Sequence, residues 1–223
     1  MKNTIEDKYP AQIVVDALRL LAYIISKTFW FIRFHGRENI PDRSFGAFLI
    51  AAYHQTYIDP VWIVIPMRRR FRFMAVEKAL KWWFIGPLIQ YLGAFPLSTD
   101  LGGTRKAMKG ALEGLRDGAV LTVFPEGARE FANGGMSEFK TGVVRIALQA
   151  GVPILPVTIS GGNRIWPRKQ KYPRLFRRVD VTYHPILNIG SASELSRNEN
   201  LKMWTAKLEE IISPGTSGKP PAR

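Results

Sequence analysis

Short apolar runs alternate with helix-forming stretches along most of this chain, and this alternation limits its fold more than any other feature of the sequence. Five runs have the length and composition of buried strands: 46–53, 71–76, 119–124, 154–159 and 179–183. Four stretches have helical composition: 61–67, 104–116, 141–150 and 200–212. Strands that alternate with helices predict a single α/β domain with a mixed, mostly parallel sheet covered by helices. The length of 223 residues fits one such domain.

Residues that commonly begin or end helices support several of these helix boundaries. Asp59 is suited to cap the helix at 61–67, and Pro60 is suited to its first turn. Gly118 and Gly151 follow two other helical stretches, where glycine commonly ends a helix. In a sheet of this kind, functional sites collect beyond the carboxyl ends of the strands.

The first apolar stretch of the chain, 13–32, predicts an N-terminal amphipathic helix. It contains three charged residues, so it is a poor match to a membrane-spanning helix. On a helix, four polar side chains share one narrow stripe with Trp30: Asp16, Arg19, Ser26 and Lys27. Two interpretations stay open. Either the helix lies in a membrane interface, with Trp30 at the headgroup boundary, or its apolar face packs on the domain.

The charge balance points to an anionic partner. Thirty-two Lys and Arg against eighteen Asp and Glu give a net charge of +14, which attracts an anionic bilayer or a nucleic acid. Basic residues gather with aromatic ones at 68–72 and 164–178, which suits lipid headgroups but also describes a solvated basic face. The absence of cysteine excludes disulfides and a cysteine nucleophile, and the three scattered histidines predict no metal site.

Two polar clusters follow directly on predicted strands: His54 with Asp59, and Glu126 with Arg129. A histidine can take a proton from a hydroxyl, and a carboxylate on its other ring nitrogen fixes the tautomer and stabilises the imidazolium. The substrate hydroxyl then takes the place of the serine in a hydrolase triad. Taken alone, the first pair also describes a structural histidine beside a helix cap.

The second cluster lies in the segment FPEGARE, 124–130, which places a carboxylate, a glycine and a guanidinium on the turn that leaves a strand. An arginine there can bind phosphate through two parallel hydrogen bonds. The alternative is a solvated loop with a surface ion pair.

Together these blocks resemble the glycerophospholipid acyltransferases, a family that includes the 1-acylglycerol-3-phosphate acyltransferases. HQTYID at 54–59 is similar to the family's first motif, H-x-x-x-x-D, and FPEGARE is similar to its third, F-P-E-G-T-R-S. VPILPV at 152–157 resembles the fourth block. The likeness covers roughly 36–162.

The resemblance implies that His54 is the general base, Asp59 its orienting partner, and Glu126, Gly127 and Arg129 residues that bind the acceptor. It implies transfer of a fatty acyl group from acyl-CoA or acyl-carrier protein, without a cofactor. The acceptor would be the free hydroxyl of lysophosphatidate or a related lysophospholipid, in phospholipid biosynthesis.

Three positions depart from the family pattern. Thr99 stands where the second motif commonly ends in an arginine that holds the acceptor phosphate, and Ala128 and Glu130 replace the usual Thr and Ser of the third motif. These departures bear on phosphate binding more than on acyl transfer, so a lyso-lipid without a phosphate monoester stays open as the acceptor. Arg105 is a candidate substitute that the sequence leaves unassigned.

The resulting division of the chain is a membrane-associating amphipathic helix at 1–35, an acyltransferase domain at 36–212 and a disordered tail at 213–223. Peripheral or monotopic binding to an anionic membrane surface, on the cytoplasmic face, is expected. A basic nucleic-acid-binding module is the alternative from another class, but it explains neither motif, so no nucleic-acid partner is expected. A serine hydrolase requires a nucleophile, and the sequence contains no G-x-S-x-G.

Overall fold

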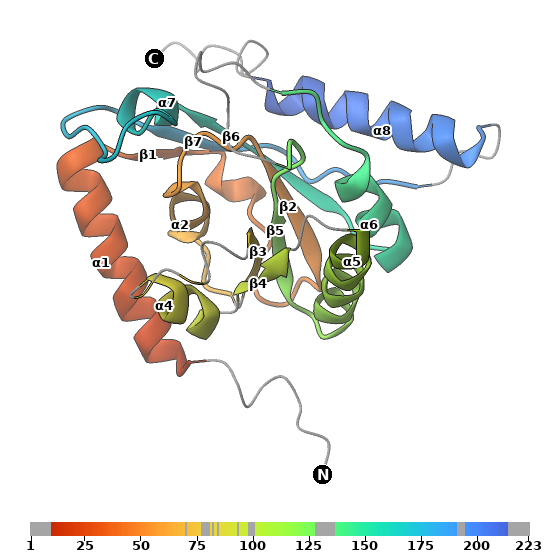
Figure 1. The fold of residues 1–223 in the computed structure, drawn as a ribbon, viewed down its shortest axis with the longest axis horizontal. Coiled ribbons are helices and arrows are strands. Elements are labelled where there is room, and N and C mark those ends of the chain that lie inside the picture. Colours follow the sequence, from red (N-terminus) through yellow and green to blue (C-terminus); the bar gives the residue numbers. More distant parts are fainter. Residues whose placement is uncertain are drawn as a thin grey trace.

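The computed structural model describes residues 10–69, 71–76, 81, 83, 85–92, 94–97, 101–127, 137–190 and 195–213. Its helices, labelled in Figure 1, are α1 (Gln12–Trp30), the 3-10 turn η2 (Arg37–Asn39), α2 (Asp59–Val64), α4 (Ile85–Tyr91), α5 (Leu101–Arg116), α6 (Gly142–Ala150), α7 (Gly162–Ile165) and α8 (Arg197–Ile212). Its strands are β1 (Arg33–His35), β2 (Phe48–Ala52), β3 (Phe71–Val76), β4 (Ala94–Leu97), β5 (Val120–Val123), β6 (Ile154–Ser160) and β7 (Asp180–Tyr183).

Seven strands of the described chain form one sheet in the order β1-β7-β6-β2-β5-β3-β4. Strands β6 and β7 pair antiparallel, and the other neighbouring strands pair in parallel. In the centre, Ala51 of β2 lies opposite Val123 of β5 on one side and Pro156 of β6 on the other. The predicted α/β class with a mixed, mostly parallel sheet is therefore confirmed, and the carboxyl ends of β2 and β5 lie next to each other.

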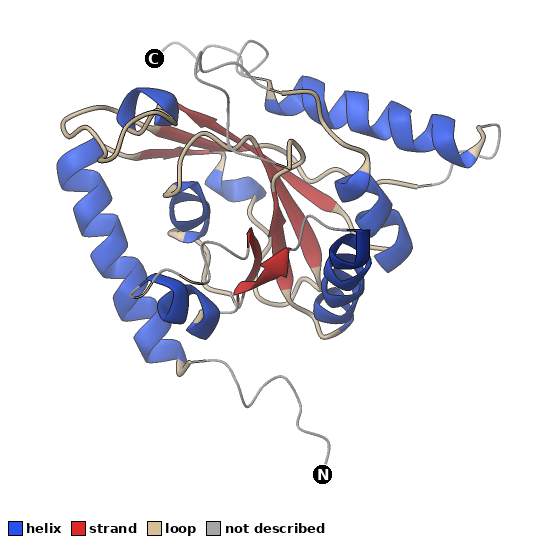
Figure 2. Ribbon diagram, viewed as in Figure 1, coloured by secondary structure: helices blue, strands red, loops and turns tan. Residues whose placement is uncertain are grey.

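Helices cover both faces of this sheet (Figure 2). Every residue of β2 is buried, as expected for a central parallel strand with a continuous apolar sequence. Alternate residues serve two cores: Phe48 and Ile50 pack beneath α1, α2 and α7, whereas Leu49 and Ala51 pack beneath α5, α6 and α8. The chain segments that follow β2 are thus anchored in both cores.

Helix α1 packs on the rest of the domain through its polar stripe. The Arg19 guanidinium pairs with Asp16 at 2.9 Å and donates to the carbonyl of Ile65 at 3.0 Å. The Ser26 hydroxyl accepts a hydrogen bond from the indole of Trp62 at 3.2 Å. These contacts fasten α1 to α2 and to the turn that follows it.

Trp30 lies on the same inward stripe and is 8% exposed, with its ring edge-to-face against Trp62 at 5.8 Å. The prediction that Trp30 sits at a headgroup boundary is therefore wrong, because its ring fills the core beneath α1. The alternative, that the apolar face of α1 packs on the domain, is wrong as well.

The apolar face of α1 points outward, and its exposed large side chains are Ile13, Val14, Leu20, Leu21, Tyr23, Ile24 and Ile25. In Figure 1 the helix stands at one side of the molecule. Among the described residues, no helix is both long and apolar enough to cross a bilayer.

Helix α2 carries Asp59 and is held at its far end by side chains from two other elements. The Tyr183 hydroxyl of β7 donates to the carbonyl of Ile63 at 2.7 Å, and Arg19 of α1 donates to that of Ile65. Carbonyls near a helix end lack partners within the helix. Strand β7 and helix α1 supply those partners, so both take part in fixing α2.

Several predicted boundaries differ from the structure. Asp59 is the first residue of α2, not its cap, because its carboxylate accepts from amides that precede the helix. Helix α2 ends at Val64, not at 67, and α5 and α8 each begin three residues before the predicted start. Strands β1 and β4, helices α4 and α7 and the 3-10 turn η2 were not predicted. The predicted tail, 213–223, lies outside the described residues except for Ser213.

Candidate active site

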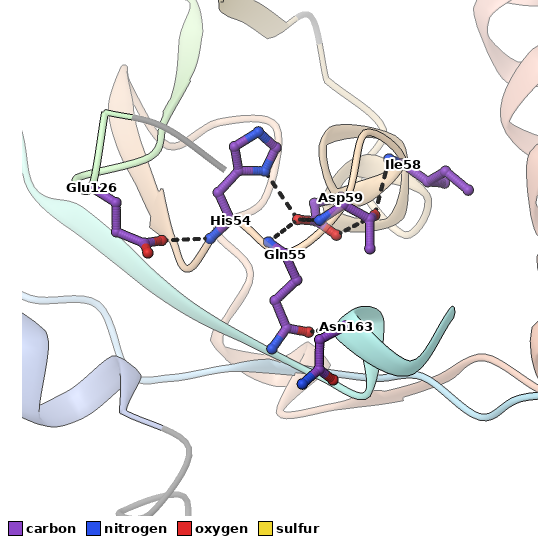
Figure 3. A network of polar contacts seen from close by, with 7 residues as sticks. His54, Gln55, Ile58, Asp59, Glu126 and Asn163 are labelled. Carbon is purple, nitrogen blue, oxygen red and sulfur yellow. Dashed lines mark hydrogen bonds and ion pairs between the residues drawn. The ribbon is translucent and has the colours of Figure 1, made fainter. Parts of the chain in front are cut away.

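The two predicted polar clusters meet at the carboxyl ends of β2 and β5. His54 follows β2 after one residue, and Glu126 follows β5 after two. The backbone amide of His54 donates to Oε1 of Glu126 at 2.8 Å (Figure 3). The adjacency of these parallel strands therefore produces the site, as the α/β prediction required.

His54 and Asp59 form the predicted pair. Nδ1 of the imidazole lies 3.0 Å from Oδ2 of Asp59, and the Asp59 side chain is fully buried. The same oxygen accepts the backbone amides of Gln55 at 2.6 Å and Thr56 at 2.7 Å, and Oδ1 accepts the Thr56 hydroxyl at 2.7 Å. A buried carboxylate requires such donors. Here they come from the turn that begins with His54.

The imidazole ring of His54 is held in one plane. It stacks on the ring of Phe124, with centroids 4.0 Å apart and planes at 20°. Because Nδ1 faces the Asp59 carboxylate, Nδ1 carries the proton and Nε2 carries the lone pair. Figure 3 shows this second nitrogen directed away from Asp59 and out of the network. The arrangement can accept a proton from a hydroxyl at Nε2.

Glu126 is 3% exposed and uses both carboxylate oxygens on backbone amides. Oε1 accepts from His54, and Oε2 accepts from Ser137 at 3.0 Å, so Glu126 ties the end of β2 to the segment that leads into α6. Burial raises the pKa of the Glu126 carboxyl, and the two amides act against that increase. These contacts position the backbone of His54. The acceptor-binding role implied for Glu126 stays a prediction.

Gly127 forms the turn after Glu126 with φ of 73°, a conformation that disfavours other residues. A Cβ at this position would lie 2.8 Å from the ammonium nitrogen of Lys140. The structure therefore places a cation that was not predicted beside this turn. Arg129, the predicted phosphate-binding residue, lies outside the described residues, as do Ala128, Glu130 and Thr99.

Other residues that hold the site were also not predicted. The Gln55 side chain accepts the backbone amide of Asn163 at 3.2 Å, which links the turn after β2 to α7 (Figure 3). A Cβ on Gly162 would meet Gln55 Oε1 at 2.6 Å, so glycine is required for this approach. Of these supporting residues, only Phe124 could have been suspected from sequence to contact the site, because it is the first residue of the segment FPEGARE.

Within the basic stretch at 68–72, Arg69 makes intramolecular contacts. The Arg69 guanidinium donates to the carbonyls of Asp42, Phe45 and Gly46, and lies 5.3 Å from the ring centroid of Phe48. Arg69 thus has a structural role, and headgroup binding by the stretch 68–72 stays a prediction. The Arg69 guanidinium holds the loop before β2 in place through these hydrogen bonds.

Comparisons with known proteins agree with this geometry. The family model described as Acyltransferase matches residues 31–160. The chain is 28% identical over 182 residues to a chloroplastic 1-acyl-sn-glycerol-3-phosphate acyltransferase of Arabidopsis thaliana, covering 81% of this chain and 50% of that protein. It is 28% identical over 167 residues to a 1-acyl-sn-glycerol-3-phosphate acyltransferase of Borreliella burgdorferi, covering 74% and 65% respectively. The chain thus spans about half to two thirds of the length of these relatives.

A solved structure shares the fold. The crystal structure of the 1-acyl-sn-glycerophosphate acyltransferase of Thermotoga maritima aligns with a TM-score of 0.69 and 24% identity, covering 100% of this chain and 85% of that one. At this identity the likeness concerns the fold alone. It agrees with the single α/β domain described above.

The buried Glu126 carboxyl generates a prediction on stability and pH. Its pKa is raised above 4.5 in the folded chain, so the proton is held more tightly in the folded than in the unfolded state. The stability that this proton contributes is present below the unfolded pKa and is lost as the pH rises through the folded pKa. Glu126→Gln cannot titrate. The free energy of unfolding of the wild type, measured relative to Glu126→Gln, should therefore fall as the pH rises above about 4.5.

Urea unfolding of both proteins over a pH series measures this difference. Compared with the ionised wild type at neutral pH, the variant has a further defect. The side-chain NH2 of the glutamine faces one of the two backbone N–H groups that the carboxylate bound, and that N–H group is left without an acceptor. Such a buried donor costs about 1–3 kcal/mol. A stability difference that stays constant or grows with pH would contradict the buried, amide-bound carboxyl.

Proposed function

Because the chain belongs to the acyltransferase family, we propose that it transfers a fatty acyl group from acyl-CoA or acyl-carrier protein to the free hydroxyl of lysophosphatidate or a related lysophospholipid. The observation that carries the proposal is the His54–Asp59 pair at the carboxyl edge of the sheet, with Nε2 of His54 directed out of the network. The names of the curated relatives, 1-acyl-sn-glycerol-3-phosphate acyltransferases, support this class of acceptor.

The geometry supports a direct transfer. Nε2 of His54 takes the proton of the acceptor hydroxyl while the oxygen attacks the thioester carbonyl of the donor. The carbon–sulfur bond then breaks, the acyl ester forms, and the imidazolium returns the proton to the thiolate. Asp59 keeps the proton on Nδ1 and stabilises the imidazolium between these steps. No acyl-enzyme intermediate is needed, since the acceptor supplies the nucleophile.

The first prediction of this proposal concerns the pair itself. His54→Ala should lower the rate of acyl transfer by about 10²–10⁴-fold, because it removes the proton acceptor. The measurement is turnover of labelled acyl-CoA with lysophosphatidate, with circular dichroism to verify folding. A folded His54→Ala protein with near-native turnover would reject the proposal.

The chain offers a matched control in His35. Its Nε2 lies 2.9 Å from Asp180, but β1 is separated from β2 by β7 and β6. His35→Ala removes a comparable His–Asp contact away from the site, and its turnover should stay close to that of the wild type. Asp59→Asn should be severe like His54→Ala, because the imidazole loses its partner charge.

The second prediction concerns the acceptor, and it rests on the motif alone because Arg129 lies outside the described residues. If the acceptor carries a phosphate monoester that Arg129 binds, Arg129→Ala removes a charge-assisted hydrogen bond worth roughly 1.5–3 kcal/mol. The value of kcat/KM for lysophosphatidate should then fall by about 10–200-fold. Arg129→Lys should restore only part of the activity, because the two-pronged geometry is lost.

An acceptor with an uncharged headgroup provides the control for this experiment. Its kcat/KM should change little in Arg129→Ala, because it offers no phosphate to bind. An equal loss on both acceptors would show that Arg129 supports its loop instead of binding phosphate. The acceptor would then be a lyso-lipid recognised by other residues.

We further propose that the protein binds the cytoplasmic face of a membrane as a peripheral or monotopic protein, through the outward face of α1. The support is the inverted orientation of this helix, whose polar stripe faces the domain and whose apolar side chains face solvent. A large exposed apolar face marks an interaction surface. The net charge of +14 favours anionic lipid, where each nearby cation contributes about 1 kcal/mol.

The double variant Leu20→Gln with Ile24→Gln tests this surface. Both side chains are more than half exposed and lie one helical turn apart, so the change leaves the packing on α2 intact. Burial of each side chain in lipid is worth about 1.5–3 kcal/mol, so partition into anionic vesicles should fall at least about tenfold in flotation. Met203→Gln, at an exposed position of α8 on the other side of the sheet, is the control. Unchanged flotation of the double variant would reject the α1 surface.

A further inference from the structure

Two phenylalanines have a backbone conformation that bulky residues rarely adopt. Among the residues that the structure describes, Phe31 with φ of 44° and Phe176 with φ of 55° are the non-glycine residues with positive φ. This left-handed region is unfavourable for a large side chain and persists only where the surroundings enforce it. Both rings are exposed, at 47% and 61%. Neither conformation serves to bury a ring.

These two residues come from distant parts of the chain and meet at one place. Phe31 directly follows α1, and Phe176 lies in the segment between α7 and β7. Their ring centroids are 6.5 Å apart, and the Phe176 ring lies 6.2 Å from that of Phe29. In Figure 1 the segment between α7 and β7 lies against the upper end of α1. Phe31 is the left-handed cap that ends α1, and the two segments thus bring two aromatic rings together on the surface.

Backbone hydrogen bonds hold this arrangement. The amide of Phe176 donates to the carbonyl of Phe29 at 2.7 Å, and the amide of Val179 donates to that of Trp30 at 3.1 Å. The indole of Trp30 donates to the carbonyl of Arg174 at 2.9 Å. The segment from 174 to 179 therefore satisfies the last carbonyls of α1. Because it is fixed to the helix, its exposed side chains keep a defined position at the C-terminal end of α1.

The surroundings of the two rings combine apolar side chains with cations. Leu175 and Tyr172 are also exposed, at 46% and 69%. The stretch 160–180 contains seven Lys and Arg and one acidic residue, Asp180, which pairs with Arg178. Exposed aromatic rings among cations match the interface of an anionic bilayer, where rings enter the headgroup region and cations meet lipid phosphates.

We propose that Phe31, Tyr172, Leu175 and Phe176, together called the aromatic tip, insert into an anionic bilayer as a second contact beside α1. This inference rests on the proposed membrane association and adds to it. A single helix lying in the interface leaves the protein free to rotate about the helix axis. A second contact away from that axis fixes the rotation, and with it the distance of the carboxyl edge of the sheet from the lipid surface.

Substitution by glycine separates membrane insertion from folding. Glycine adopts positive φ without strain, so Phe31→Gly and Phe176→Gly remove the rings and relieve the backbone together. Each variant should bind vesicles of phosphatidylcholine and phosphatidylglycerol roughly 10-fold less tightly, while its thermal unfolding midpoint stays the same or rises. Phe45→Gly, at an exposed ring before β2 on the opposite edge of the sheet, should leave vesicle binding unchanged. Unchanged binding of the two tip variants would overturn the proposal.

The absence of cysteine permits a direct measurement of insertion. Phe176→Cys carries a single environment-sensitive fluorophore, and Phe45→Cys carries the same probe as a control. On addition of vesicles, the emission at 176 should shift to the blue and the emission at 45 should not. If the labelled protein floats with vesicles while the probe at 176 stays in water, the tip proposal fails and the α1 surface stands. If the protein does not float at all, the proposed membrane association itself fails.

Discussion

The site depends on the burial of one carboxylate. Asp59 has no exposed surface, so its charge must be compensated by donors within the protein. Those donors are the amides of Gln55 and Thr56, the Thr56 hydroxyl and Nδ1 of His54. Because the chain wraps around the carboxylate to supply them, the turn after β2 has one conformation. The imidazole is oriented as a consequence. Glu126, which follows β5, is a second buried carboxylate that binds backbone amides, and one of these is the amide of His54.

The helix that bears Asp59 is short and depends on its neighbours. Six residues make few internal hydrogen bonds, so α2 draws its stability from tertiary contacts. Tyr183 and Arg19 satisfy carbonyls at its end, and Ser26 and Trp30 engage Trp62. The helix whose outer surface we assign to lipid therefore contacts the helix that carries the residue orienting the base.

Sequence reasoning succeeded where one feature of the sequence was decisive. Continuous apolar runs predicted the central strands because a strand that is buried on both faces has mostly apolar side chains. The edge strands β1 and β4 were missed: β1 has only three residues, two of them basic or histidine, and β4 contains a proline, which is unfavourable within a strand. The start of α8 was missed although Ser196 and Glu199 form a capping box there. Periodicity identified the polar stripe of α1 but not its direction, and spacing identified His54 and Asp59 but not the backbone amides bound by Glu126.

The orientation of α1 also determines which of its residues can be exchanged. In the proposed lipid contact the outward residues need only be apolar, so Leu20 and Ile24, which are more than half exposed, can be replaced by polar residues, whereas Tyr23 stacks on Phe34. Its inward residues make specific contacts, as Arg19 does with the carbonyl of Ile65 and Ser26 does with the indole of Trp62. Removing the helix would leave both partners buried and unsatisfied or newly open to water. Surface redesign of α1 therefore keeps its packing on α2, whereas truncation of the helix removes it.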